Sequence, residues 1–294
     1  MPPRSPGRRL RDAYGARPIM IPGAFNALTA RMAERLGFEA VYLSGGALAA
    51  GWAGVPDIGL LSAVEFADAV AALARASDLP VLADADTGFG EAVHVERTVR
   101  LYEGAGAAGL HLEDQVMPKR CGHLSGKGLV DAASMVAKVR AAVAARSDPD
   151  FVVVARTDAR SVEGFDAAVE RARRYVEAGA DMIFPEALES AEEFAAFARA
   201  VPVPLIANMT EFGRSPLLDF EELARIGYRA VLYPLTAFRA AMKAAERTLA
   251  ALREHGTQRG ELDRMQSRAE LYDLLGYDDW EARDRAYFGG TPGR

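Results

Sequence analysis

The single cysteine of this 294-residue chain lies in a short stretch whose neighbours suit acid–base or nucleophilic chemistry. Cys121 follows two cations, Lys119 and Arg120, and precedes Gly122 and His123. A structural cysteine usually sits among apolar neighbours and behaves as a small buried hydrophobe. Positive neighbours favour the thiolate over the thiol, and they also attract anionic substrates. We therefore predict that Cys121 is a catalytic residue in a basic loop.

Two aspartates further upstream predict a metal site. Asp84 and Asp86 are two positions apart in an extended segment, so their carboxylates project to the same side. Ligand sets made only of oxygen suit Mg²⁺ or Mn²⁺, and Mg²⁺ takes one or two carboxylates while it keeps several waters. Asp57 and Glu113 are candidates to hold those waters. The 4 histidines of the chain make no zinc-spaced pair, so we predict Mg²⁺, with Mn²⁺ as the alternative, and no zinc.

Three arginines are candidates for binding substrate carboxylates through two-point guanidinium contacts. They are Arg156, Arg239 and Arg268, and Arg156 is the strongest candidate because it follows an apolar run directly. A metal, a basic loop and several arginines together indicate a polyanionic substrate, and the thiol adds a proton donor or nucleophile. This set of groups predicts carbon–carbon bond cleavage of a small polycarboxylate.

The elements that must position these groups alternate along the chain. Short apolar runs are separated by longer alanine-rich segments with helical periodicity. The eight runs cover residues 19–21, 40–43, 81–83, 109–112, 152–155, 182–184, 205–207 and 231–233. Polar residues follow most of them, as expected where a (β/α)8 barrel builds its active site at the carboxyl ends of its strands. A doubly wound open sheet is the alternative, but no Gly-x-Gly-x-x-Gly follows the first run.

Composition sets further expectations. The net charge of −6 argues against a general nucleic-acid binder, and no apolar run approaches the roughly 18 residues of a membrane span. One cysteine allows no intrachain disulfide, so we expect a cytoplasmic protein without a secretory signal. We expect residues 1–11 to form a flexible basic tail and residues 12–294 to form one barrel domain. That domain would include a helical appendage from about residue 257, packed on the barrel or on a neighbouring subunit.

Several stretches resemble motifs of the isocitrate lyase and phosphoenolpyruvate mutase superfamily. The stretch KRCGH at 119–123 resembles its catalytic loop. The others are YLSGG at 42–46, DADTGFG at 84–90, GLHLEDQ at 109–115, ARTD at 155–158, FPE at 184–186, NMTE at 208–211 and YPLTAFR at 233–239. The resemblance runs from about residue 19 to the C-terminal helices. Within the superfamily the chain looks most like the 2-methylisocitrate lyases, a likeness that includes GTQ at 256–258 and MQSRAELY at 265–272.

The resemblance implies a (β/α)8 barrel that exchanges its last helices between paired subunits of a homotetramer. It implies Mg²⁺ at Asp84 and Asp86, with Asp57 and Glu113 acting through water. The implied substrate contacts are Ser44, Gly45, Gly46, Cys121, Gly122, Arg156, Glu186, Asn208, Thr210, Arg239 and Arg268.

The reaction implied by the resemblance is cleavage of 2-methylisocitrate into pyruvate and succinate, a step of the methylcitrate cycle in propionate catabolism. Lys119, Arg120 and His123 would offset the charge of the succinate carbanion, and Cys121 as thiol would donate the proton that completes succinate. The base that accepts the proton of the substrate hydroxyl stays open. Tyr42 is one candidate, and a water held by Asp57 or Glu113 is the other.

The resemblance also implies that Phe184, Leu232 and Pro234 form an apolar wall that accepts the extra methyl group of 2-methylisocitrate. Isocitrate lyase and 2,3-dimethylmalate lyase remain alternatives, because both would keep the metal and the basic loop. An oxaloacetate decarboxylase or a phosphonate mutase would keep the barrel and the metal but would not need the KRCGH loop. A binding protein without activity is disfavoured by the ring of acidic residues together with Cys121.

Overall fold

The computed structural model describes residues 4–124 and 126–288, and the chain divides into two compact units, 1–239 and 240–294. All the strands lie in the first unit, and each coincides within two residues with a predicted apolar run. They are β1 (Ile19–Pro22), β2 (Val41–Leu43), β3 (Val81–Asp84), β4 (Gly109–Glu113), β5 (Val152–Thr157), β6 (Met182–Pro185), β7 (Ile206–Asn208) and β8 (Ala230–Tyr233).

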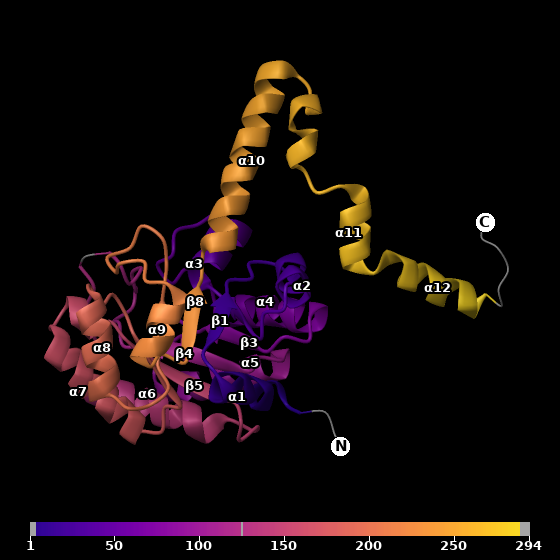
Figure 1. Ribbon diagram of the computed structural model, residues 1–294. Helices are drawn as coiled ribbons and strands as arrows, with labels where there is room; N and C mark the ends of the chain where they lie inside the picture. The colour runs from indigo at the N-terminus through magenta and orange to yellow at the C-terminus, as the bar shows by residue number, and fades with distance from the viewer. Residues whose placement is uncertain (1–3, 125, 289–294) are drawn as a thin grey trace. The chain divides into compact units, whose positions relative to one another are not determined.

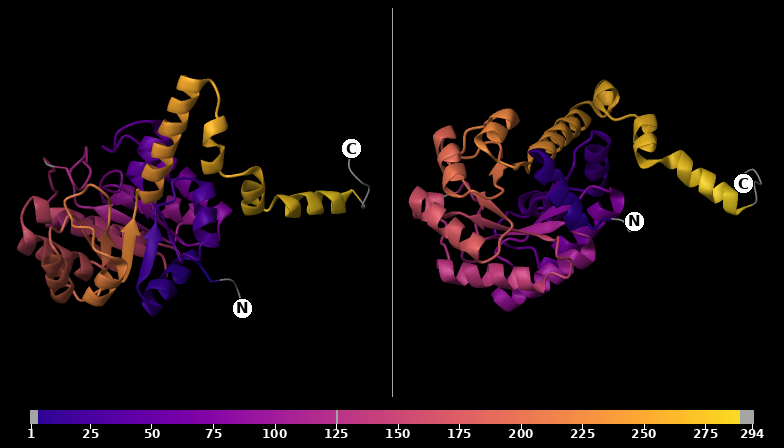
Figure 2. Two further views of the ribbon diagram at one scale, coloured as in Figure 1. Left: turned by 45° about the horizontal axis from the view of Figure 1, so that its top comes forward. Right: turned by 60° about the horizontal axis from the view of Figure 1, so that its bottom comes forward.

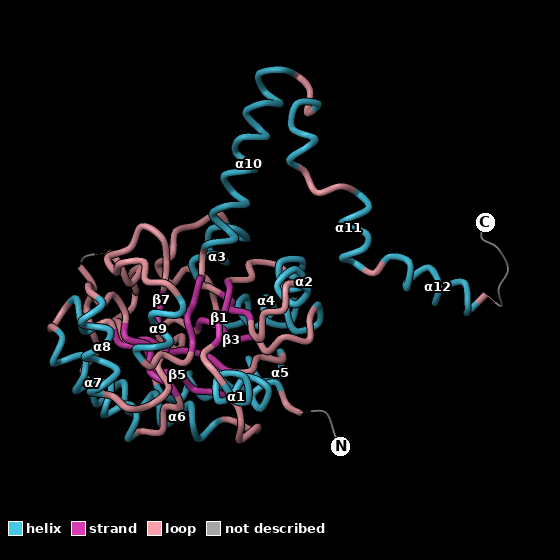
Figure 3. Tube along the Cα trace, in the orientation of Figure 1, coloured by secondary structure: helices cyan, strands magenta, loops and turns pink. Residues whose placement is uncertain are grey.

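The strands pair in parallel and in chain order. Strands β2 to β6 form one sheet in the order β2-β3-β4-β5-β6, and a second sheet has the order β1-β8-β7. Isolated parallel bridges join the two sheets at both edges, between Gly23 and Tyr42 and between Ile183 and Leu205. The eight strands therefore follow one another around a ring, with the helices outside them (Figure 1, Figure 3). The predicted (β/α)8 class is confirmed.

Apart from α1, which precedes β1, the helices of the first unit separate successive strands, and they lie on the outside of the strands in two further views (Figure 2). They are α1 (Pro6–Ala16), α2 (Ala27–Arg35), α3 (Gly45–Leu48), η1 (Ala49–Ala53), α4 (Ala63–Ala76), α5 (Ala92–Ala105), α6 (Ala132–Ala145), η2 (Ala159–Ser161), α7 (Phe165–Glu177), α8 (Ala191–Ala200) and α9 (Phe220–Ile226). Local sequence sets their ends: Ser62 and Glu65 form a capping box at the start of α4. Gly227, with φ at 116°, ends α9 in the left-handed conformation.

Alternation along the strands decides which side chains reach the interior of the barrel. In β5, Val153 and Ala155 pack in the cluster shared with the helices, whereas Val152 and Val154 belong to the inner cluster. Because successive side chains of a strand point to opposite faces, Arg156 continues the inward series. On the other strands, too, every second side chain faces the interior, up to the carboxyl end of the strand. The interior of the barrel is thus filled by apolar side chains and closed on one side by polar ones.

The N-terminal segment differs from the expectation of a flexible tail over residues 1–11. Residues 1–3 lie outside the described residues, but α1 begins at Pro6, with Ser5 accepting a hydrogen bond from the N–H of Arg8. Leu10 and Tyr14, one helical turn apart, are buried with the inner side chains of the barrel strands. The prediction of a flexible tail is therefore wrong for residues 6–11, because this segment contributes apolar side chains to the core.

The described part of the second unit, residues 240–288, consists of helices joined by short loops (Figure 3). Helix α10 (Thr236–His255) begins in the first unit, and η3 (Arg259–Arg264), α11 (Arg268–Leu275) and α12 (Tyr277–Tyr287) follow. The unit starts at Ala240 rather than near residue 257, because α10 is one uninterrupted helix of 20 residues. No residue of α10, α11 or α12 is buried. Among the described residues, no helix is both long and apolar enough to cross a membrane.

Candidate active site

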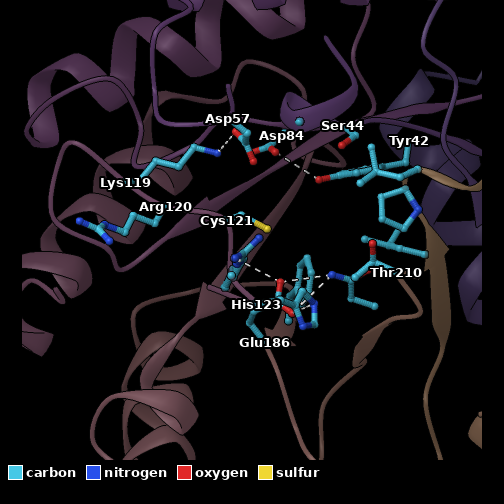
Figure 4. A pocket seen from close by; sticks show the side chains of 18 residues that line it. Tyr42, Ser44, Asp57, Asp84, Lys119, Arg120, Cys121, His123, Glu186 and Thr210 are labelled. Atoms are coloured by element: carbon cyan, nitrogen blue, oxygen red, sulfur yellow. Dashed lines mark hydrogen bonds and ion pairs between the residues drawn. The ribbon is translucent and has the colours of Figure 1, made fainter. Parts of the chain in front are cut away.

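A pocket at the carboxyl ends of the strands collects most of the predicted site residues (Figure 4). The predicted residues that line it are Tyr42, Ser44, Gly46, Asp57, Asp84, Lys119, Arg120, Cys121, Gly122, His123, Arg156, Phe184, Glu186, Asn208, Thr210, Leu232 and Pro234. Leu235 also lines the pocket and was not predicted. These residues come from six of the eight strands or the segments directly after them, from the loop after β4 and, for Asp57, from the segment between η1 and α4. The fold therefore brings them together from distant parts of the sequence.

Three predicted residues lie directly behind the lining. The backbone N–H of Gly45 donates a hydrogen bond of 3.0 Å to Oδ2 of Asp84. Oδ1 of Asp86 is 2.8 Å from Nζ of Lys119. Glu113, at the end of β4, is buried, with Oε2 at 3.4 Å from Nε of Arg156. All three therefore act on the pocket through residues that line it.

The two remaining arginines are not part of the pocket lining. Arg239 lies in the first turn of α10, where Nε is 3.5 Å from Oε2 of Glu211, and 44% of its side chain is exposed. Arg268 is the first residue of α11 in the second unit. Their proposed roles in substrate binding stay predictions.

The carboxylates of the predicted metal site gather around the ammonium group of Lys119. Nζ forms ion pairs with Asp57 and Asp86, and Asp84 accepts a 2.9 Å hydrogen bond from the N–H of Asp86. Burial opposes the charge of Lys119, but the carboxylates around it raise its pKa, so it is protonated. Burial and the nearby charge of Asp84 raise the pKa of Asp86 to about 7. This concentration of acidic oxygens favours a cation.

The donor set restricts which metal could bind. Within residues 4–124 and 126–288, no three His, Cys, Asp or Glu side chains are grouped as a metal cluster. Two carboxylates without nitrogen or sulfur partners suit a hard ion that keeps most of its waters. Oε1 of Glu113 is buried and, among the described residues, has no hydrogen-bond partner. An unpaired buried oxygen of this kind fits a site completed by water or an ion.

Cys121 is partly buried, and its sulfur points toward the middle of the pocket (Figure 4). Burial raises the pKa of the thiol, and the carboxylates of Asp57 and Glu186 raise it further. The N–H of His123 and the charge of Arg156 act in the opposite direction but do not outweigh burial. The expectation that neighbouring cations favour the thiolate is therefore wrong.

The positions of the two cations explain this difference. Lys119 is directed at Asp57 and Asp86, and Arg120 points away from the other labelled residues (Figure 4). The guanidinium of Arg120 lies near Gly126, where an added Cβ would be 3.0 Å from Nη1. The charges of Lys119 and Arg120 are thus directed away from the sulfur of Cys121. The thiol of Cys121 is therefore protonated at neutral pH.

His123 and Glu186 form the opposite wall of the pocket. Nε2 of His123 is 3.1 Å from Oε1 of Glu186, and Nδ1 accepts a 2.9 Å hydrogen bond from the N–H of Arg214. Because Nδ1 accepts, the ring proton lies on Nε2 and faces the carboxylate. Asn208 donates to the same carboxylate at 3.2 Å. Although Glu186 is buried, Arg156 and His123 hold its pKa well below the usual range, so it is ionised.

Arg156 lies among three carboxylates. It donates hydrogen bonds of 2.9 and 3.2 Å to Asp158 from Nε and Nη2, and Nη2 is 3.1 Å from Oε2 of Glu186. The guanidinium also lies over the ring of Phe184, 5.2 Å from its centroid. A Cβ at position 122 would be 2.3 Å from Nη2 of Arg156, so only glycine allows the loop to approach this closely.

Tyr42 lies beside a buried histidine that sequence reasoning gave no role. The hydroxyl of Tyr42 is 2.6 Å from Nε2 of His111 and donates a hydrogen bond of 3.4 Å to Asp84. Burial raises the pKa of Tyr42 well above its ordinary value and lowers that of His111 to about 4. Both groups are therefore neutral near pH 7.

Two further residues were missed, Lys127 and Asp158. Nζ of Lys127 is 2.7 Å from Oδ1 of Asp158, and both side chains are buried. Asp158 is the last residue of the ARTD stretch, and Lys127 lies four residues after His123. The signals in the sequence were membership of the ARTD stretch for Asp158 and proximity to the basic loop for Lys127, whereas the burial of both residues depends on the fold.

Comparison with known proteins places the chain in a family. The model of the family described as phosphoenolpyruvate phosphomutase matches residues 10–253. The chain belongs to this family.

Curated relatives support the same placement. The chain is 54% identical over 284 residues to the 2-methylisocitrate lyase of Aeropyrum pernix, covering 96% of this chain and 91% of that protein. It is 49% identical over 281 residues to the 2-methylisocitrate lyase of Escherichia coli, covering 95% of each.

Solved structures share the fold of this family member. Oxaloacetate acetylhydrolase in complex with 3,3-difluorooxalacetate is 35% identical, with a TM-score of 0.92 and coverage of 98% of this chain and 99% of that one. The 2,3-dimethylmalate lyase is 34% identical, with a TM-score of 0.91 and coverage of 99% and 98%. Phosphonopyruvate hydrolase in complex with oxalate and Mg⁺⁺ is 34% identical, with a TM-score of 0.88 and coverage of 97% and 100%.

Proposed function

We propose that this protein is a carbon–carbon lyase that cleaves 2-methylisocitrate into pyruvate and succinate. The observation that carries the proposal is the position of the Cys121 thiol, which lines the same pocket as Asp84 and Arg156. A proton donor, a binding group for carboxylates and acidic oxygens suited to a metal are the groups that this cleavage needs. Identity of about half to relatives named 2-methylisocitrate lyase supports the choice of substrate.

Mg²⁺, or Mn²⁺ in its place, would be held by Asp84 and Asp86, with Asp57 and Glu113 acting through water. The all-oxygen donor set and the unpaired Oε1 of Glu113 support this assignment. A bound divalent ion would stabilise negative charge on the hydroxyl and carboxylate oxygens of the substrate. Lys119, which now pairs with Asp57 and Asp86, would then be free to turn its charge toward the substrate.

Substrate carboxylates would be bound on the side of the pocket that holds Arg156. A guanidinium has five N–H donors, and the contacts of Arg156 with Asp158 and Glu186 involve Nε and Nη2, which leaves Nη1 for the substrate. Ser44, Asn208 and Thr210 place further polar groups at the pocket. The other residues proposed to contact the substrate in or next to the pocket are Gly45, Gly46, Gly122 and Glu186.

Two proton transfers complete the reaction. The proton of the substrate hydroxyl would pass to Tyr42 as the hydroxyl of Tyr42 gives its own proton to Nε2 of His111, 2.6 Å away. A water held by Asp57 or Glu113 is the other candidate for the base. The bond between the hydroxyl-bearing carbon and its neighbour then breaks, and the electron pair remains on the succinate portion. Cys121 donates its thiol proton to this carbon, and Lys119, once released from Asp57 and Asp86, would offset the negative charge. Arg120 would add its charge by turning toward the substrate, and His123 would add a hydrogen bond from Nε2.

The wall formed by Phe184, Leu232 and Pro234 would receive the methyl group that distinguishes 2-methylisocitrate from isocitrate. All three line the pocket, and Phe184 and Leu232 belong to the inner apolar cluster. Burial of one methyl group supplies discrimination of roughly 1–3 kcal/mol.

We further propose a homotetramer in which the helices of the second unit are exchanged between paired subunits. Supporting this, α10 to α12 bury no residue, and they expose large apolar side chains such as Leu249, Leu252 and Trp280. Apolar surface of this extent indicates a partner, and a second copy of the chain is the occupant proposed. Light scattering after gel filtration would give a tetramer mass; a monomer would contradict the proposal.

The function is tested by offering purified protein 2-methylisocitrate, isocitrate and 2,3-dimethylmalate in turn with Mg²⁺. Pyruvate from the first substrate, formed faster than any product of the others, supports the proposal. A preference for 2,3-dimethylmalate would instead move the assignment to the lyase that shares its fold with this chain.

A further inference from the structure

A buried lysine with no role in the proposed reaction lies directly behind the loop that carries Cys121. Nζ of Lys127 is 2.7 Å from Oδ1 of Asp158 and donates a hydrogen bond to the carbonyl oxygen of Gly122. Only 1% of the Lys127 side chain and none of the Asp158 side chain is exposed. Burying an ammonium group or a carboxylate costs free energy unless the group is paired. Losing the contact between Lys127 and Asp158 would therefore destabilise the fold.

Asp158 is itself fixed to the end of the barrel. Its backbone N–H donates a 2.9 Å hydrogen bond to Asp114, and its carboxylate accepts hydrogen bonds from Nε and Nη2 of Arg156. One carboxylate therefore binds both the arginine of the pocket and the lysine of the loop. Lys127 extends this connection to the carbonyl of Gly122, the residue that follows Cys121.

The loop has little space to shift without disturbing the pocket. A Cβ at Gly122 would be 2.3 Å from Nη2 of Arg156 and 2.5 Å from Cγ of Glu186, so the loop backbone already touches both side chains. Lys127 does not line the pocket. Any effect of Lys127 on the reaction must therefore act through Gly122 and Asp158.

We propose that Lys127 is a positioning residue, which holds the Cys121 thiol in register with Arg156 by binding Asp158 and the carbonyl of Gly122. The inference rests on the proposed function for its effect on turnover. The position of the thiol, however, can be measured without any substrate. Because Cys121 is the only cysteine of the chain, its alkylation reports on this loop alone.

The test compares Lys127→Met with the wild type in the intact protein. Loss of a hydrogen bond from a charged donor predicts alkylation of Cys121 by iodoacetamide that is faster by about tenfold. Misplacement of the thiol by about 1 Å predicts a fall in kcat of about 10²-fold, with a smaller change in KM. Lys127→Arg keeps a positive charge and hydrogen-bond donors, so its alkylation rate and its kcat should both lie closer to those of the wild type. Lys127→Gln, which keeps a polar partner for Asp158, serves if Lys127→Met does not fold.

Arg146 offers a matched control at the opposite ends of the strands. Its Nη1 binds a carboxylate, Asp181 at 2.9 Å, and a carbonyl, Phe151 at 3.1 Å, just before β6 and β5 begin. Arg146→Met is expected to lower thermal stability and leave alkylation and kcat unchanged.

Three outcomes would overturn the inference. They are wild-type alkylation in a folded Lys127 variant, unchanged kcat despite faster alkylation, and equal acceleration in Arg146→Met. Absence of 2-methylisocitrate cleavage by the wild type would count against the proposed function only, because the alkylation comparison does not depend on turnover.

Discussion

His123 and Glu186 meet across the pocket, with Nε2 of the histidine 3.1 Å from Oε1 of the glutamate. One residue belongs to the loop after β4 and the other follows β6 directly. Together with the contact between Lys127 and Asp158, this pair fastens the loop to the ends of two strands. The sulfur of Cys121 is therefore held at the pocket by contacts of the residues that directly follow it in the loop.

Cys121→Ser is expected to reduce kcat by at least roughly 10²–10⁴-fold, the contribution of a general acid. A serine hydroxyl is far less acidic than a thiol, so donation of the proton to the carbanion fails. Circular dichroism and thermal melting check that the fold is unchanged. A variant that kept more than about a tenth of wild-type kcat would remove Cys121 from this role.

The pH dependence of turnover follows from the protonation state of Cys121. Burial and the carboxylates of Asp57 and Glu186 raise the pKa of the thiol, while Arg156 acts against them. The thiol donates only when protonated, so a raised pKa moves the alkaline loss of kcat to higher pH. We expect Cys121, followed by its alkylation rate against pH, to titrate above the ordinary value of about 8.5. A midpoint below that value would contradict the assignment.

Activity is expected to depend on a divalent metal bound through Asp84 and Asp86. EDTA should abolish turnover and Mg²⁺ or Mn²⁺ should restore it, because carboxylate oxygens are the ligands that suit these ions. Asp84→Asn should weaken Mg²⁺ binding in calorimetry, whereas Asp166→Asn, on helix α7, serves as the control. Full activity of thoroughly demetallated protein would exclude this requirement.

The apolar wall of the pocket predicts which substrate is preferred. With Phe184, Leu232 and Pro234 lining the pocket, kcat/KM for 2-methylisocitrate should exceed that for isocitrate at least about tenfold. Coupled assays distinguish pyruvate from glyoxylate. Equal rates, or a preference for isocitrate, would assign the chain to isocitrate cleavage instead.

The strands and the pocket could be predicted because both follow from local patterns. Each strand is an apolar run between helical segments, and inward alternation carries Arg156 to the open end of β5. The helix at residues 6–16 was missed because Leu10 and Tyr14 stand alone among polar residues, and their burial depends on the strands they cover.

Charge effects were harder to predict than positions. Lys119 and Arg120 adjoin Cys121 in sequence, but their side chains point to Asp57 and toward Gly126. The burial of Lys127 with Asp158 joins residues from different loops, which no spacing within the sequence indicates. Tertiary contacts decide the protonation of Cys121, and sequence neighbours do not.

The central claim is that carbon–carbon cleavage in this pocket ends with proton transfer from Cys121. It is tested most directly by incubating the protein with 2-methylisocitrate and Mg²⁺ in D₂O and analysing the products by mass spectrometry. The thiol exchanges its proton with solvent, so the account predicts equal amounts of pyruvate and succinate, with one deuterium in each succinate. Intact substrate, or succinate without deuterium, would contradict it.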